Sequence, residues 1–182
     1  SFIRCVYQSK DGFLWFGSNS GLFRYDGYGC EEYKKIPFQE NSLCDNSVIS
    51  IVEDSLEQLW LGTISGLSCF NRKNHVFKNF YFNAQHSLIG IVSDVMYDQG
   101  FVFFATLSGL FRIDINTFHM EKVNDLNVQK IVIDYSGRIW LITYQNELFY
   151  SDKESNDDSI SMKNLISKKN MKMKDILVSK DS

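Results

Sequence analysis

Proline, histidine and cysteine are scarce in this chain, which has one proline, three histidines and four cysteines among 182 residues. The cysteines (Cys5, Cys30, Cys44 and Cys69) show no C-x-x-C spacing, which argues against a zinc site. They can pair in an oxidising compartment or remain buried free thiols, and we favour free thiols. We expect no metal site and no cofactor.

Long hydrophobic runs and a strong charge of one sign are also missing. No apolar segment is long enough to cross a bilayer, and the net charge of −3 gives no electrostatic reason to bind nucleic acid or an anionic membrane. A basic cluster at Lys168, Lys169, Lys172 and Lys174 is interpreted as a solvated loop. No signal peptide is present, but Ser1 lies within a predicted strand, so we expect that it is not the natural start and infer nothing about compartment.

The chain does contain a repeated unit rich in strand-forming residues. The segment Asp11–Asp26 recurs as Leu59–Leu67, as Val102–Leu110 and, more weakly, as Ile139–Asn146. The apolar and aromatic contents of 44% and 15% indicate a folded core. A unit of roughly forty residues with this composition is typical of a propeller or another repeat array.

The copies align on one aromatic position, occupied by Trp15, Trp60, Phe103 and Trp140. Three residues earlier stand Gly12, Glu57, Gly100 and Gly137. Six residues earlier is an aspartate position, filled by Ser9, Asp54, Asp134 and, if one residue is deleted, Asp98. Aspartate followed by glycine between apolar runs is typical of a turn, because the carboxylate bonds backbone N–H groups and glycine accepts positive φ. Each copy therefore predicts a β-hairpin.

Other columns of the repeat predict how the strands pack. Apolar residues six and three positions before the aspartate position are Ile3 and Val6, Val48 and Ile51, Val92 and Val95, and Val128 and Ile131. A small residue follows the aromatic position by two in three copies, as Gly17, Gly62 and Ala105, whereas Ile142 breaks the pattern. A second turn is expected at Gly21, Gly66, Gly109 and Asn146. The small residues predict close approach of neighbouring units.

The sequence thus predicts an all-β fold, a β-propeller of four-stranded antiparallel blades with about four blades of a larger ring. The expected blades are residues 1–45, 46–90, 91–126 and 127–173, and residues 174–182, with Asp181 at the aspartate position, would open a further blade. The polar stretch Ser151–Lys174 is predicted to be a long loop. Because four blades leave two uncovered faces, we expect residues 1–182 alone to be unstable or to aggregate.

The motifs Gly12–Ser18, Gly21–Tyr28, Asn41–Val48 and Leu59–Thr63 resemble the two-component regulator propeller repeat. The resemblance is clear in the first two units, fair in the third and weak in the fourth. It implies a segment of a seven-bladed propeller in the periplasmic sensor region of a hybrid histidine kinase of the Bacteroidetes type. The resemblance further implies the architecture of this family, which has two tandem propellers, a β-sandwich domain, one membrane helix and cytoplasmic kinase modules.

The resemblance also implies what this segment does and does not do. The segment is expected to be non-catalytic and to contribute to detecting an oligosaccharide or glycan breakdown product outside the inner membrane. Dimerisation and membrane attachment are expected through other parts of the polypeptide, and no nucleic-acid contact is expected. Ligand contacts in this family do not map onto the repeat consensus, so no binding residue is transferred.

Two other functions remain open from the sequence. A propeller enzyme, such as a lyase or glycosidase, predicts converging carboxylates, but turns explain Asp54, Asp98 and Asp134, and adjacent Glu31 and Glu32 point to opposite faces of a strand. A protein-binding propeller of the WD kind predicts Gly-His and Trp-Asp pairs, which the repeats lack. We identify no catalytic residue.

Histidines and tyrosines offer weaker candidates. His75 and His119 stand at similar places in the predicted outer strands of two units, and repeat-equivalent positions lie too far apart in a ring to share a ligand. We therefore interpret both as exposed or packing residues. Five tyrosines can either form a sugar-stacking surface or, as we favour, pack between blades: Tyr28, Tyr33, Tyr81, Tyr97 and Tyr144.

Overall fold

The computed structural model describes residues 2–81, 90–152 and 160–166. Regular structure in these ranges consists of sixteen β-strands arranged in four antiparallel sheets of four strands each. Within the same ranges no helix is long and apolar enough to span a bilayer. The predicted all-β class with four-stranded antiparallel sheets is confirmed.

Each sheet is formed by four strands that follow one another in the chain. The first sheet contains β1 (Ile3–Gln8), β2 (Leu14–Ser18), β3 (Leu22–Tyr25) and β4 (Cys30–Tyr33). The second contains β5 (Val48–Glu53), β6 (Leu59–Thr63), β7 (Leu67–Asn71) and β8 (Val76–Phe80). The third contains β9 (Val92–Asp98), β10 (Phe101–Thr106), β11 (Gly109–Asp114) and β12 (Met120–Asn124). The fourth contains β13 (Val128–Ile133), β14 (Ile139–Thr143), β15 (Leu148–Asp152) and β16 (Ser161–Ile166).

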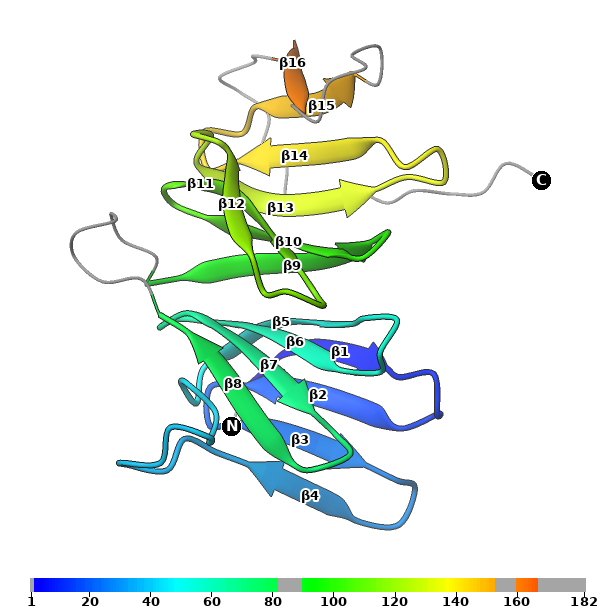
Figure 1. The fold of residues 1–182 in the computed structure, drawn as a ribbon, viewed down its shortest axis with the longest axis vertical. Helices are drawn as coiled ribbons and strands as arrows, with labels where there is room; N and C mark the ends of the chain where they lie inside the picture. The colour runs from blue at the N-terminus through cyan, green and yellow to red at the C-terminus, as the bar shows by residue number, and fades with distance from the viewer. Residues whose placement is uncertain (1, 82–89, 153–159, 167–182) are drawn as a thin grey trace.

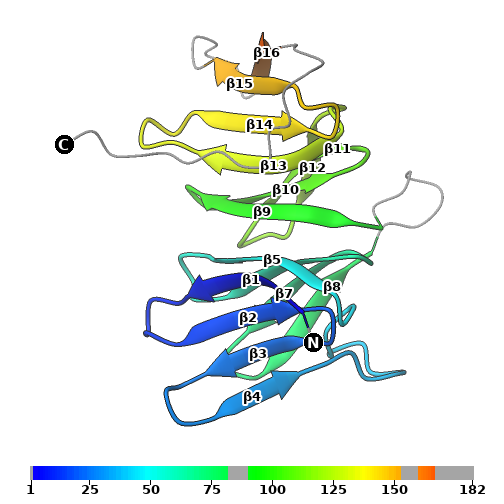
Figure 2. The ribbon, with the colours of Figure 1, turned by 180° about the vertical axis from the view of Figure 1, so that it is seen from behind.

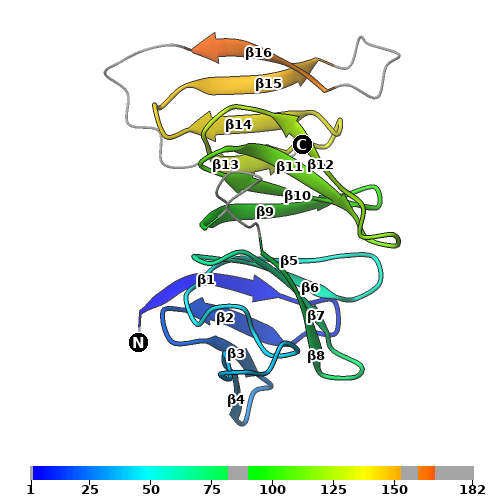
Figure 3. The same cartoon turned by 60° about the vertical axis from the view of Figure 1, so that its left-hand side comes forward.

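The sheets are arranged as propeller blades (Figure 1). The first strands of the four sheets contact one another in series, β1 with β5, β5 with β9 and β9 with β13. Figures 2 and 3 show the remaining strands of each sheet extending away from this inner row. The first strand of each unit is therefore the innermost one, and the repeat sets the order of strands from the inside outward.

The first hairpin of each sheet follows the predicted turn chemistry. The residue three before the aromatic position has positive φ in every copy, with 91° at Gly12, 62° at Glu57, 88° at Gly100 and 72° at Gly137. Glu57, the exception in sequence, therefore adopts the same backbone conformation as the glycines. In the third sheet Gln99 (φ 45°) and Gly100 form a two-residue turn between Asp98 and Phe101, which confirms the deletion that the alignment required.

The second turn of the first three sheets has a glycine, and Gly66 of the second sheet shows two reasons for it. Gly66 has a φ of 148°, and a Cβ atom there would lie 2.6 Å from the carbonyl oxygen of Phe80 on the fourth strand of the same sheet. Thr63 stabilises the same turn, because its hydroxyl donates to the Gly66 carbonyl at 2.9 Å and accepts from the Ser65 N–H at 3.2 Å. Asn146 fills the glycine position of the fourth sheet with a φ of 60°.

The hydrophobic core lies between sheets. One cluster joins Trp15 and Leu22 of the first sheet to Val48 and Ile51 of the second. The next joins the second sheet to the third, and the last joins the third sheet to the fourth. Each sheet therefore depends on its neighbour for burial, as expected for a repeat array.

The predicted loop Ser151–Lys174 is wrong in part. β15 extends to Asp152, and β16 (Ser161–Ile166) pairs with it as the fourth strand of the last sheet. An outermost strand needs backbone pairing more than an apolar pattern, so its polar sequence gave no strand signal. The start of a further blade at residues 174–182 and the basic cluster at Lys168–Lys174 lie outside the described residues.

Candidate functional site

Two aspartates of the repeat, Asp54 and Asp134, accept hydrogen bonds both from the backbone of the turn and from a tryptophan indole. Asp54 accepts hydrogen bonds from the backbone N–H groups of Leu56 and Gln58 through Oδ1, and from the Trp60 indole through Oδ2 at 2.7 Å. Asp134 holds Trp140 in the same way at 2.8 Å. The sequence identified both residue types but not this pairing, although their constant spacing of six residues is a signal for it.

Ser9, which fills the aspartate position of the first sheet, accepts the Trp15 indole hydrogen bond at 3.0 Å. At Asp134, burial raises the pKa of the carboxyl, but hydrogen bonds from Ser136, Trp140 and Arg138 outweigh it and lower the pKa to about 2. An anion held in this way is a poor proton carrier at neutral pH.

A charged cluster joins the first two sheets at the ends of their first hairpins. The Arg72 guanidinium forms ion pairs with the buried Glu53 and, at 2.5 Å, with Asp11 of the preceding sheet. Its Nε also donates to the Glu57 carbonyl at 2.8 Å. Glu53 accepts a further hydrogen bond from the Lys10 N–H at 2.8 Å. The two carboxylates that converge here are bridged by one cation, which engages both of them instead of leaving an acid–base pair.

A third buried carboxylate, that of Asp94, connects three innermost strands. Asp94 on β9 accepts from the Ser50 hydroxyl on β5 at 2.8 Å and from the Ile131 N–H on β13 at 3.0 Å. Lys130 Nζ lies 3.7 Å from its Oδ2. Burial raises the pKa of Asp94, and Lys130 opposes that effect. Sequence analysis missed this residue, although the position that pairs with the small residue of the repeat is polar in three sheets, as Ser50, Asp94 and Lys130.

Partners within the protein therefore occupy all three buried carboxylates of the described residues, Glu53, Asp54 and Asp94. Across residues 2–81, 90–152 and 160–166, no group of three or more histidine, cysteine or acidic residues is placed to hold a metal ion. Glu53 and Asp94 contact neighbouring sheets and Asp54 holds its own hairpin, so these three carboxylates offer no free pair to a substrate.

The cysteines are free thiols, but the interpretation as buried free thiols holds for only two of the four. Cys44 and Cys69 are buried, Cys5 is half-buried and Cys30 is exposed. Burial raises the pKa of Cys5 to about 11 and that of Cys69 to about 12, so neither is a thiolate nucleophile at neutral pH.

His75 and His119 lie in turns just before β8 and β12, not within the outer strands as predicted. Both side chains are exposed. His75 also packs on aromatic rings, with centroid distances of 6.4 Å to Tyr33 and 6.2 Å to Phe70. A packing role for His75 is therefore supported, and the strand assignment is corrected by the positive φ of 56° that places it in the turn.

The five candidate tyrosines separate by burial. Tyr33 packs against Trp15 and Phe70, and Tyr97 packs against the core between the second and third sheets, so the packing interpretation holds for these two. Tyr28, Tyr81 and Tyr144 are exposed. Their exposure fits the alternative, a surface that can stack on a sugar.

Tyr81 is the one of these three that lines a groove found in the described residues. The groove has a volume of about 630 Å³ and is lined by Glu40, Asn41, Val76, Phe77, Lys78, Asn79 and Tyr81. It lies where the connection between the first two sheets crosses the outer edge of β8. The Phe77 N–H donates to the Asn41 carbonyl at 3.1 Å, which fixes this crossing.

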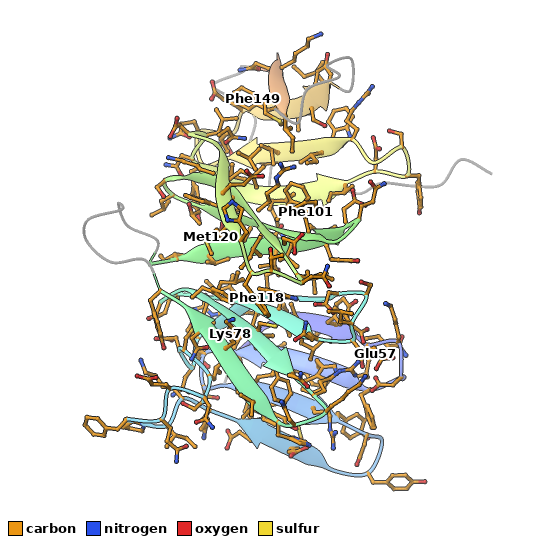
Figure 4. The ribbon with its side chains drawn as sticks, in the orientation of Figure 1. Glu57, Lys78, Phe101, Phe118, Met120 and Phe149 are labelled. Atoms are coloured by element: carbon orange, nitrogen blue, oxygen red, sulfur yellow. The ribbon has the colours of Figure 1, made fainter. Side chains whose placement is uncertain are left out.

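Contacts within the protein hold the walls of the groove. The Asn79 amide is fully used, because it donates to the carbonyls of Glu40 (3.0 Å) and Ser42 (2.8 Å) and accepts from Ser68 (2.7 Å). Lys78 extends across to the third sheet, where its Nζ lies 3.6 Å from the ring centre of Phe118 (Figure 4). The exposed ring of Tyr81 beside the Glu40 carboxylate is chemistry suited to a hydroxyl-rich ligand.

The model of the two component regulator propeller family matches residues 1–20 and 42–65. Among curated proteins none matches the chain. Solved structures are similar in fold. The extracellular domain of a protein described as a hybrid two component system from B. thetaiotaomicron aligns with a TM-score of 0.76 and 19% identity over 91% of this chain and 24% of that one. These matches confirm the propeller fold class.

Two further structures extend the comparison. The extracellular domain of a protein described as a one component system from B. thetaiotaomicron has a TM-score of 0.70 and 18% identity over 90% of this chain and 25% of that one. PorZ, described as a surface component of the type-IX secretion system of Porphyromonas gingivalis, has a TM-score of 0.61 and 13% identity over 88% of this chain and 26% of that one. The chain thus spans about a quarter of each structure, and identities this low establish the fold alone.

Proposed function

This chain carries the two component regulator propeller repeat at residues 1–20 and 42–65, and from that premise we propose that it is a segment of an extracytoplasmic sensor propeller. The parent is a hybrid two-component histidine kinase, and the segment itself is non-catalytic. It operates in the periplasm and contributes to detecting an oligosaccharide or glycan breakdown product. The family match carries the proposal, and the extracellular domains of similar fold support it.

The internal partners of the charged groups support a binding role over an enzymatic one. Arg72 bridges Glu53 to Asp11, and Asp94 is engaged by Ser50 and Ile131, so these carboxylates act as contacts between sheets. Signalling by such a protein requires that the ligand bind one arrangement of the ectodomain more tightly than another. A rigid set of sheets joined by polar contacts can transmit that difference.

The groove at Tyr81 is our candidate for the contact with sugar. Tyr81 stands at the edge of the groove and is 58% exposed. The Asn79 amide and the Phe77–Asn41 hydrogen bond hold the walls of the groove in place. Burial raises the pKa of the Tyr81 phenol, so the hydroxyl stays protonated and can donate a hydrogen bond at neutral pH. A preformed groove loses little conformational entropy on binding.

Calorimetry with purified oligosaccharide pools tests this proposal on the gene product expressed in full. We expect a binding signal that Tyr81→Ala weakens about tenfold, equivalent to about 1.4 kcal/mol. Tyr28→Ala is the matched control, because Tyr28 is fully exposed, with 101% relative exposure, and lines none of the described cavities. This control should leave the affinity unchanged.

Three outcomes would contradict parts of the proposal. If Tyr81→Ala and the unsubstituted protein bind the oligosaccharides with equal affinity, the groove is not the binding site, although the sensor function is not contradicted. Turnover of the oligosaccharides would favour a propeller enzyme. Stable capture of a protein partner, with no heat from any glycan, would favour a protein-binding scaffold.

A further inference from the structure

The connection between β4 and β5 presents an apolar tip to solvent. Ile36, Pro37 and Phe38 form this tip, and the exposures of Ile36 and Phe38 are 48% and 107%. Figure 1 shows the connection projecting away from the sheets. Single exposed apolar residues are common on protein surfaces, so exposure alone does not indicate a function. The backbone of the tip supplies a second observation.

Phe38 has a strained backbone conformation that its own packing does not explain. Its φ is 65°, in the left-handed region that is unfavourable for a bulky side chain. Phe118 has a similar φ of 58°, and its ring packs on Phe80 and Trp60 at centroid distances of 5.8 and 6.1 Å. Phe38 adopts the same conformation with its ring fully exposed. Strained residues of this kind cluster at functional sites.

Hydrogen bonds hold the tip in one conformation. The Ser42 hydroxyl accepts from the Ile36 N–H at 2.9 Å and donates to the Gln39 carbonyl at 2.8 Å. The Asn79 amide on β8 fixes the following residues through the carbonyls of Glu40 and Ser42. The tip is therefore preorganised and loses little conformational entropy on binding. Fixed aromatic side chains of this kind are typical anchors of protein interfaces.

The same connection forms part of the groove at Tyr81. Glu40 and Asn41 follow the tip and line the groove, together with Val76 and Tyr81. One surface of the molecule therefore carries both an apolar projection and a groove with apolar walls. Two copies related by a two-fold axis can pair such a surface with itself, because each supplies the projection that the groove of the other receives.

Charged residues on this surface fit the same pairing. Lys35 precedes the tip and Glu40 follows it, and neither forms an ion pair within the part of the chain that the structure describes. In a two-fold pair, Lys35 of one copy can approach Glu40 of the other. Lys34 already pairs with Glu32 at 2.8 Å, so the tip has no excess of positive charge that would attract an anionic membrane.

We propose that Phe38 of one copy of this chain binds in the Tyr81 groove of a second copy, with the reciprocal contact formed across a two-fold axis. The contact is small, so it forms when other parts of the polypeptide hold two copies close together. It does not require a ligand. One consequence does rest on the proposed function: a sugar bound at Tyr81 and Phe38 of the second copy exclude each other, so the sugar opens the contact.

Photo-crosslinking between two tagged copies of the full gene product tests the contact. Cells co-express a copy that carries benzoylphenylalanine at position 38 and an unsubstituted copy with a different affinity tag. We expect an adduct that contains both tags and that peptide mass spectrometry maps to residues 76–81 of the unsubstituted copy. Benzoylphenylalanine at Tyr28, which is 101% exposed, is the matched control, and its yield should be at least about tenfold lower.

A change in the groove gives a second measurement. Val76→Asp in the unsubstituted copy places a charge against the apolar ring and should lower the yield at position 38 by at least about fivefold. Val76 is 36% exposed, so the fold tolerates the substitution. Leu56→Asp is the matched control, because Leu56 is 48% exposed in the turn between β5 and β6 and does not line this groove. This control should leave the yield unchanged.

Three crosslinking results would overturn the contact. They are an adduct of position 38 with its own copy, with another protein or with a segment outside residues 76–81, a yield no higher than at position 28, and a yield that Val76→Asp leaves unchanged. Oligosaccharide that binds by calorimetry should lower the yield, and an unchanged yield would overturn the mutual exclusion. Absence of any calorimetric binding would contradict the proposed function instead, while the crosslink without sugar still decides the contact.

Discussion

The indole N–H of Trp60 donates a 2.7 Å hydrogen bond to Oδ2 of Asp54, the residue that also forms the turn six positions earlier. Both residues are fully buried, and the second oxygen of the carboxylate holds the backbone N–H groups of Leu56 and Gln58. One side chain thus fixes the hairpin and the orientation of the aromatic ring. This double role explains why aspartate and tryptophan occur together in the repeat.

Replacing Asp54 should destabilise the protein strongly. Asp54→Ala leaves the Trp60 indole and two backbone N–H groups buried without their acceptor, which costs about 3 kcal/mol in the free energy of unfolding. Urea unfolding of the purified protein measures this. Asp125→Ala is the control, because the Asp125 side chain is 90% exposed and its ion pair with Lys122 contributes less than about 1 kcal/mol. Equal losses in both variants would contradict a special role for Asp54.

Enlarging Gly62 should also be costly, although it lies in a strand where other residues are usually preferred. In Gly62→Ala the new Cβ would lie 2.8 Å from the Val92 carbonyl oxygen, a backbone atom that cannot move away freely. We expect a loss of about 1 to 3 kcal/mol, typical of overpacking. Gly29→Ala is the matched control, since nothing lies within 4 Å of its Cβ position. A neutral Gly62→Ala would show that the sheets are not in close contact there.

Removing Arg72 should destabilise the protein, because Arg72 pairs with Glu53 of its own sheet and with Asp11 of the first sheet. Arg72→Ala leaves Glu53, whose side chain is fully buried, without its cation, and breaking a buried pair in this way costs about 3 to 5 kcal/mol. Arg112→Ala removes a pair with the part-exposed Glu121 inside a single sheet and should cost about 1 kcal/mol or less. Urea midpoints of the two variants test the difference. If Arg72→Ala behaves like Arg112→Ala, the buried pair of Arg72 with Glu53 is not a major contribution to stability.

The carboxyl of Asp134 predicts a stability change in acid. Its pKa is lowered from 3.8 to about 2, so its contribution is present above about pH 3.8 and is lost as the pH falls toward 2. The difference in urea midpoint between the unsubstituted protein and Asp134→Asn should therefore shrink between about pH 5 and about pH 2. A difference independent of pH would show that the hydrogen bonds to Asp134 do not depend on its charge.

Asp94 predicts the opposite sign. Burial raises its pKa above 3.8, so its contribution is greatest below that pH and is lost as the pH rises through the raised value. Relative to Asp94→Asn, the unsubstituted protein should lose stability on going from acid to neutral pH. The same urea series measures it, and a loss in the other direction would mean that Lys130 outweighs burial.

Local features of the fold were predictable from sequence because each depends on residues close in the chain. The positive φ at Gly12, Gly66 and Gly100 follows from turn chemistry, and burial of the apolar columns follows from strand alternation. β16 was not predictable, because an outermost strand carries little apolar pattern. The tyrosines illustrate the same limit, since packing leaves Tyr33 half-buried against Phe70 and Tyr81 exposed at a groove.

The sequence by itself determined the repeat, the order of strands in each sheet and the small residues through which sheets touch. Only the tertiary structure decided which charged groups meet, because Arg72 and Asp11, or Asp94 and Ser50, are brought together by the packing of separate sheets. It also decided that Ile3 and Val6 are uncovered while their equivalents are buried. The physical reason is the same in both cases. A repeat specifies the surface of each unit, whereas contacts and exposure depend on which unit stands next to it.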